Sequence, residues 1–174
     1  MQTFALPETG EEDGLLEVEL VGVCGSDPGI FRGKQTFGPR PFPIIMGHEI
    51  VGRIAAIGRG ARERHGVVEG DRVVVEYAFG CGFCDSCRSG QYATCEKHYA
   101  YGSMVSCKDP PHLFGAYGEF LYIHPNAKVH RIGDEISPQL GVLICAVLGN
   151  GIRWLRQAGN VSIGPLPPQD EAQH

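Results

Sequence analysis

The chain has 174 residues, 43% of them hydrophobic, which suffices for one domain with an apolar core. Its 15 Lys and Arg residues stand against 20 Asp and Glu residues, so the net charge of −5 argues against a nucleic-acid partner. The longest nearly apolar run, residues 140–148, is shorter than the roughly 18 residues of a membrane span, and the N-terminus lacks a signal-peptide pattern. These features predict a cytoplasmic protein without a membrane partner.

Short strands are expected over the first two thirds of the chain. Residues 16–20 alternate apolar and acidic side chains, which is typical of a half-buried strand, and this strand runs on toward Cys24. Further strands are predicted over residues 50–54, 72–76, 120–123 and 127–130. Many turns formed by the 25 Gly and 12 Pro residues would separate these strands, a pattern that favours a barrel-like β domain.

Helices are expected in the last third. Ser137 followed by Pro138 is typical of a helix start. Apolar residues then recur at helical spacing and predict a buried stripe, formed by Leu140, Leu143, Ile144, Val147 and Leu148. A second helical stretch is expected through Trp154, and residues 161–164 resemble the start of a strand. The predicted fold class is therefore mainly β with C-terminal helices (α+β).

Seven cysteines need a chemical explanation, because the cytosol keeps thiols reduced and disfavours disulfides. Four of them have the spacing C-x2-C-x2-C-x7-C, namely Cys81, Cys84, Cys87 and Cys95. Four thiolates complete a tetrahedron around zinc and leave no coordination position open, so the predicted zinc site is structural. An iron–sulfur cluster and four unrelated reduced cysteines are the less favoured alternatives.

A second candidate site is weaker on the residues alone. Cys24 and His48 lie at the ends of predicted strands beside glycines, where side chains can reach a cleft. Asp27 could orient an imidazole, as carboxylates do beside metal-bound histidines. A lone cysteine and a lone histidine are more often packing residues, so the sequence leaves both interpretations open.

Five motifs occur in a fixed order: GVCGSD (22–27), GHEIVG (47–52), EGDRV (69–73), the four-cysteine segment, and GAYGEF (115–120). In this combination the sequence resembles the medium-chain zinc-dependent alcohol dehydrogenases with a GroES-like catalytic domain. The resemblance implies a partly open β-barrel catalytic domain over residues 1–160. It also implies a zinc-binding lobe at residues 80–100, and a truncated start of a nucleotide-binding domain at residues 161–174.

The resemblance further implies a catalytic zinc. Cys24 and His48 correspond to its first two ligands, and Cys145 falls where the family supplies the third. Cys145 fits equally well as a small apolar residue beside the helical stripe. Glu49 resembles the acidic residue beside the metal that can exchange as a ligand.

Two more residues would act around that zinc. Asp27 resembles the carboxylate that holds His48, and Ser26 resembles the hydroxyl that passes the alcohol proton outward. The alternative for both is ordinary turn chemistry. Many family members continue this proton relay with a histidine where Gly29 stands here, so we expect a shorter relay.

The implied activity is oxidation of a small-molecule alcohol or polyol, in which zinc polarises the alcohol and hydride passes to NAD or NADP. These 174 residues contain no G-x-G-x-x-G dinucleotide motif, so we expect them to be inactive by themselves. The alternative is a non-enzymatic zinc-binding remnant or scaffold that fills the structural site only. A homo-oligomer is compatible with either reading.

Overall fold

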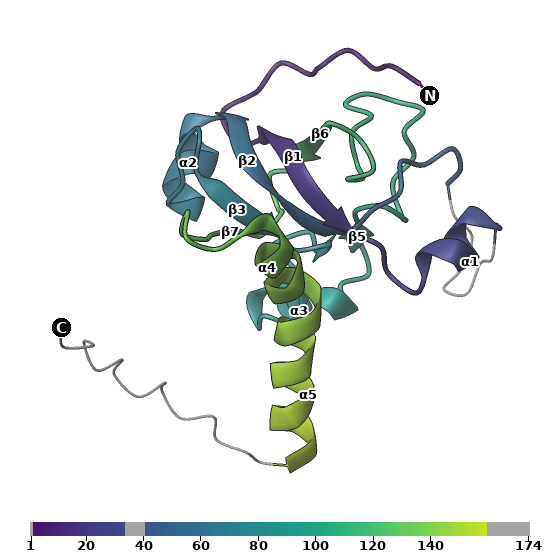
Figure 1. The fold of residues 1–174 in the computed structure, drawn as a ribbon, viewed down its shortest axis with the longest axis vertical. Coiled ribbons are helices and arrows are strands. Elements are labelled where there is room, and N and C mark those ends of the chain that lie inside the picture. Colours follow the sequence, from purple (N-terminus) through teal and green to yellow (C-terminus); the bar gives the residue numbers. More distant parts are fainter. Residues whose placement is uncertain (1, 34–40, 160–174) are drawn as a thin grey trace.

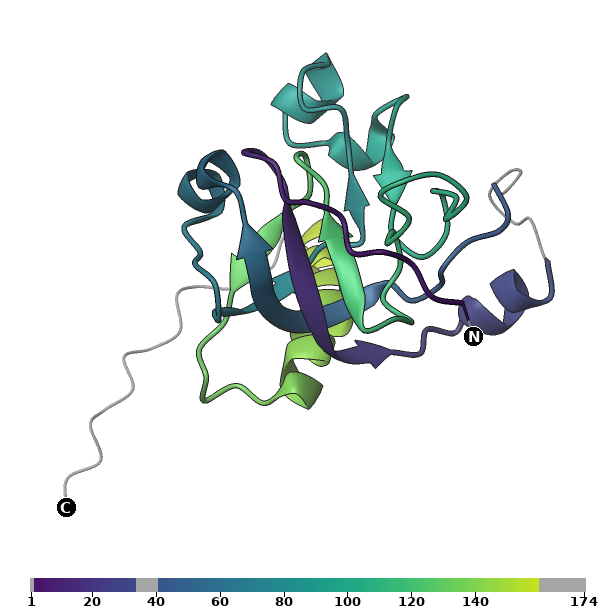
Figure 2. The same cartoon turned by 90° about the horizontal axis from the view of Figure 1, so that it is seen from above.

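A computed structural model describes residues 2–33 and 41–159 (Figure 1). Its centre is a five-stranded antiparallel sheet with the strand order β6-β1-β2-β3-β7. The strands are β1 (Gly14–Gly22), β2 (Glu49–Ile57), β3 (Arg72–Val75), β6 (Phe120–Ile123) and β7 (Val129–Arg131). The sheet is twisted and open, with β6 and β7 at its edges (Figure 2). The mainly β fold with C-terminal helices is confirmed.

The C-terminal helices form one continuous run over residues 138–159. It consists of α4 (Pro138–Val142), a π-helical segment η2 (Leu143–Leu148) and α5 (Gly149–Gly159). The run begins as predicted, because Oγ of Ser137 caps it by accepting a hydrogen bond from the backbone N–H of Leu140 at 3.3 Å. The strand predicted over residues 161–164, and the domain boundary placed there, lie outside the described residues.

Alternating side chains along the strands enter two different cores. Ile50 of β2 and Val73 of β3 belong to the larger core, which also contains Leu16 of β1. Their neighbours Val51 and Val74 point to the opposite face and form a smaller core with α4. Because both faces of β2 and β3 are covered, their sequences are short runs of β-branched apolar residues without alternation, and these runs located the two strands correctly.

The predicted burial of the helical apolar stripe is wrong for most of its length. Leu143 and Val147 of η2 are 48% and 56% exposed, so these side chains do not face the sheet. Beyond η2, α5 projects away from the sheet (Figure 1). α4 packs on the sheet through Val142, and η2 still reaches the smaller core through Cys145. The 19-residue helix Pro138–Arg156 has a mean hydropathy of 1.2 and is long and apolar enough to cross a membrane. One helix selected by length and composition alone is weak evidence for a membrane span.

Several short elements were not predicted, since their sequences are too short to show a period. They are α1 (Asp27–Phe31), α2 (Arg59–His65), α3 (Asp85–Arg88), the 3-10 helix η1 (Tyr92–Thr94), β4 (Ala78–Phe79) and β5 (Tyr99–Ala100). The helices α3 and η1 lie within the predicted lobe at residues 80–100, which stands out from the sheet (Figure 2). The strands β4 and β5 pair at the base of this lobe.

Candidate metal sites

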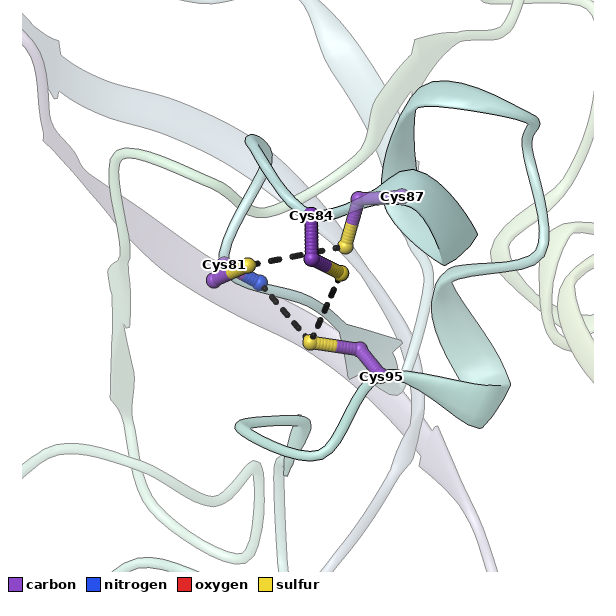
Figure 3. A group of neighbouring side chains, drawn as sticks. All are labelled: Cys81, Cys84, Cys87 and Cys95. Atoms are coloured by element: carbon purple, nitrogen blue, oxygen red, sulfur yellow. Dashed lines mark hydrogen bonds between the residues drawn. The ribbon is translucent and has the colours of Figure 1, made fainter.

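The structure brings together the four cysteines of the lobe (Figure 3). Sγ of Cys81 lies 3.9 Å from Sγ of Cys87, and Sγ of Cys84 lies 3.7 Å from Sγ of Cys95. All four sulfur atoms lie within 4.8 Å of one another. Zinc–sulfur bonds of about 2.3 Å in a tetrahedron would separate the sulfurs by about 3.8 Å. The donor set and its spacing therefore fit a zinc ion with four protein ligands.

A glycine makes this convergence possible. A Cβ atom at Gly80 would overlap Sγ of Cys87 and would lie 3.1 Å from Cβ of Cys95. The backbone also supports the cluster, because the N–H of Cys81 donates to Sγ of Cys95 at 3.4 Å. The lobe thus owes its shape to a glycine and to sulfur contacts, with little apolar packing of its own.

The thiols of the cluster differ in how easily they ionise. A hydrogen bond from the backbone of Phe83 lowers the pKa of the Cys81 thiol to about 6. The backbone of Cys87 acts in the same direction on Cys84, but burial and hydrogen bonds with the neighbouring sulfurs outweigh it and raise the pKa of Cys84 to about 12. Four adjacent thiolates repel one another, so only a bound cation would favour all four in the ionised form.

The register between β1 and β2 assembles the second group. Gly22 at the end of β1 pairs with Glu49 at the start of β2, so the residues just beyond these ends, Cys24 and His48, meet. The ligand atoms of Cys24, His48 and Glu49 lie within 4.8 Å of one another. A Cβ atom at Gly22 would overlap the Glu49 carboxylate. A thiol, an imidazole and a carboxylate form a donor set that suits zinc and leaves a fourth position open.

Asp27 lies beside this group and is only 3% exposed. Its Oδ2 atom accepts hydrogen bonds from the backbone N–H of Cys24 and from the hydroxyl of Tyr117, both at 2.8 Å. Its Oδ1 atom is buried without a hydrogen-bond partner among the described residues, and lies 3.6 Å from Nδ1 of His48. A carboxylate beside Nδ1 favours a proton there and leaves Nε2 free for a metal. The unpaired oxygen therefore supports the fit of a metal to His48.

Cys145 lies outside the set of mutually close ligand atoms around Cys24. It belongs to η2 and packs against the smaller core, and its Sγ donates to the carbonyl of Val75 at 3.3 Å. Burial raises the pKa of its thiol. Its assignment as the third zinc ligand stays a prediction, beside the alternative of an apolar packing residue.

Ser26 occupies the exposed turn before α1 and makes no side-chain capping bond there. Its relay role also stays a prediction. Sequence reasoning assigned no role to Tyr77, whose ring centroid lies 5.9 Å from that of His48, or to Tyr117. The motif containing Tyr117 was recognised, but its contact with Asp27 joins residues that lie 90 positions apart and has no local signature.

Comparison with known proteins agrees with this architecture. Residues 10–134 match the family described as the alcohol dehydrogenase GroES-like domain. The chain belongs to this family, and the resemblance inferred from the five motifs is confirmed.

Among curated relatives, the chain is 40% identical over 157 residues to a probable alcohol dehydrogenase of Mycobacterium tuberculosis, covering 88% of this chain and 41% of that protein. It is 33% identical to an erythritol/L-threitol dehydrogenase of Mycolicibacterium smegmatis, covering 80% of this chain and 39% of that protein. Among solved structures, an alcohol dehydrogenase from Thermotoga maritima superimposes with a TM-score of 0.72 at 28% identity, covering 82% of this chain and 39% of that chain. The chain thus spans about two fifths of the length of these relatives.

Proposed function

We propose that this polypeptide is the zinc-binding catalytic part of an oxidoreductase that oxidises a small alcohol or polyol. The observation that carries the proposal is the group formed by Cys24, His48 and Glu49, with the buried carboxylate of Asp27 beside it. The similarity to relatives named as alcohol and erythritol/L-threitol dehydrogenases supports the substrate class.

The residues around the proposed zinc would have different roles: metal binding, positioning of the His48 ring and proton transfer. Cys24, His48 and Glu49 would hold a zinc ion, whose chemical contribution is Lewis acidity that lowers the pKa of an alcohol hydroxyl. Asp27 would favour the tautomer of His48 that carries the proton on Nδ1 and leaves Nε2 available, since its Oδ1 lies 3.6 Å from Nδ1. Ser26, one residue before Asp27 on the exposed turn, would accept the alcohol proton and pass it to solvent.

An open groove beside Asp27 offers a route for the substrate. It has a volume of about 340 Å³, and its lining residues are Val23, Asp27, Pro28, Phe31, Met46 and Tyr117. The four apolar members would contact the carbon skeleton of an alcohol. Phe31 is strongly exposed, so its ring is available to a substrate or to another part of the protein.

We further propose that the hydride acceptor is NAD or NADP, held by polypeptide in addition to these 174 residues. The chain spans about two fifths of its relatives and contains no G-x-G-x-x-G sequence. We also propose that the protein is located in the cytoplasm.

A second candidate function is a zinc module that fills only the four-cysteine site. The observation that favours it is the bond from Cys145 to the carbonyl of Val75, which engages the sulfur away from the Cys24 group. Such a module would have a folded lobe but no open metal position.

The number of zinc ions per chain distinguishes the two functions. We expect two in the zinc-loaded protein by elemental analysis, one in the His48→Ala variant and one in the Cys87→Ser variant. A single zinc in the parent chain that survives His48→Ala would contradict the catalytic proposal and support the zinc module.

A further inference from the structure

Tyr117 contacts the carboxylate of Asp27, which lies beside the Cys24 group. It follows a buried segment, residues 113–116, and its own side chain is 40% exposed at the groove beside Asp27. Its hydroxyl does not turn to solvent but donates a hydrogen bond of 2.8 Å to Oδ2 of Asp27.

The backbone holds Tyr117 firmly in this position. Its N–H donates to the carbonyl of Met46 at 2.8 Å, and the N–H of Ala116 donates to the carbonyl of Gly47 at 3.0 Å. These bonds tie Tyr117 to the two residues that directly precede His48. The phenol and the imidazole are therefore carried by neighbouring backbone segments and can act on one carboxylate from two sides.

The carboxylate of Asp27 has two oxygen atoms with different tasks. The hydroxyl of Tyr117 and the N–H of Cys24 both occupy Oδ2. Oδ1 has no partner among the described residues other than His48, 3.6 Å away. Two donors on one oxygen fix the rotation of the carboxylate and point the other oxygen at the histidine. Burial and the bond to Asp27 raise the pKa of Tyr117, so its hydroxyl remains a proton donor through the neutral range.

We propose that Tyr117 is a positioning residue of the metal site: its hydroxyl locks Asp27 so that Oδ1 holds Nδ1–H of His48 and Nε2 is directed to the metal. This inference rests on the proposed function, because it requires a metal at His48. The principle is that groups holding a metal ligand through a hydrogen bond contribute strongly to metal affinity. Tyr117 acts one bond further out, through Asp27.

The test compares two Tyr→Phe variants in the zinc-loaded chain. Tyr117→Phe removes one hydroxyl that bonds to Asp27. Tyr122→Phe is the matched control, because it removes a hydroxyl that bonds to another aspartate, Asp13 Oδ2, at 2.9 Å. Zinc affinity is measured by competition with a chromophoric chelator, and the fraction that belongs to His48 is identified with His48→Ala.

We expect Tyr117→Phe to weaken that zinc fraction by up to about tenfold, the lower end of the range for groups around metal ligands. We also expect it to change the nitrogen NMR shifts of the His48 ring, which report the position of the ring proton. Tyr122→Phe should change neither. Equal affinity and equal His48 shifts in the parent and in Tyr117→Phe would overturn the inference while leaving the metal site intact. If instead His48→Ala removes no zinc fraction, the metal site itself is absent and the proposed function fails with it.

Discussion

The backbone of Tyr117 lies directly against Gly47. A Cβ atom at Gly47 would come 2.7 Å from the nitrogen of Tyr117, and Gly47 also has a φ of +91°, which side chains rarely tolerate. Glycine is therefore required twice at the residue before His48, once for the conformation and once for the contact.

Gly47→Ala should lower the free energy of unfolding by more than the strain of a positive φ alone would. Gly70→Ala is the matched control, because Gly70 has a φ of +87° but open space around its Cα. Both variants carry a cost of about 1–2 kcal/mol for the left-handed conformation. Gly47→Ala carries a further cost of about 1–3 kcal/mol for the overlap with Tyr117. Urea unfolding measures the free energy of unfolding of both variants. If both lose the same amount, the contact with Tyr117 adds no destabilisation and the prediction is wrong.

Cys87→Ser should release one zinc and loosen the lobe at residues 80–100. The lobe gains its order from the sulfur cluster, and metal binding in such a segment is coupled to its folding. Limited proteolysis followed by mass spectrometry should find new cleavage sites between residues 80 and 100. Cys107→Ser is the control, since Cys107 is buried and belongs to neither metal-binding group. Unchanged zinc content and protease resistance in Cys87→Ser would refute the assignment.

Mild chelation should remove zinc from the Cys24 group before it removes zinc from the lobe. Three mutually close ligands bind less tightly than four, and an open groove is lined by Asp27, which lies beside the Cys24 group. A titration with chelator should therefore show two steps, of which His48→Ala removes the first. His130→Ala is a control, because His130 is exposed and bonds to Glu76 outside both groups. A single step in the parent chain would contradict the prediction.

Mild acid should weaken the fold through His124. Its ring stacks on Phe79 with centroids 4.7 Å apart, and its Nδ1 accepts a hydrogen bond from the backbone N–H of Asn126 at 3.1 Å. Burial lowers the pKa of His124 below its ordinary value of 6.5. A depressed pKa in the folded state contributes stability above pH 6.5 that is lost as the pH falls through the folded-state pKa.

His124→Phe keeps the aromatic contact and removes the titrating group. Its unfolding free energy should change less between pH 7.5 and 5.5 than that of the parent chain, measured in urea at both pH values. The unfolding free energy of the parent minus that of the variant should therefore be smaller at pH 5.5 than at pH 7.5. A constant difference would mean that His124 does not titrate in this range.

The 174 residues alone should produce no NADH from alcohols, even with zinc bound. Positioning of the nicotinamide beside the substrate can lower the barrier by roughly 7–11 kcal/mol, and this sequence contains no glycine-rich motif to supply it. Fusion of a relative's nucleotide-binding segments after Gly164 should give zinc-dependent NADH formation, and Gly29→His in that fusion should raise the rate by extending the proton relay. Saturable NAD binding by the unfused chain in calorimetry would contradict this prediction.

The sequence by itself determined the features that depend on neighbours along the chain. The spacing from Cys81 to Cys95 predicted the sulfur cluster, because a short loop can bring its own residues together. Alternation in residues 16–20 located β1, because a strand with one face in a core repeats every two residues. Family motifs added the partners Cys24 and His48, which no local pattern joins.

Only the tertiary structure decided how distant segments meet. Pairing of Gly22 with Glu49 sets the register that joins Cys24 to His48, and such a register depends on the whole sheet. The bond from Tyr117 to Asp27 arises in the same way, since chain folding brings two separate turns to one carboxylate. For the C-terminal helical run, residues 138–159, the tertiary structure overruled the sequence pattern. Its apolar stripe follows the periodicity of a buried helix, but burial requires a facing surface, and Leu143 and Val147 have none, since both remain about half exposed.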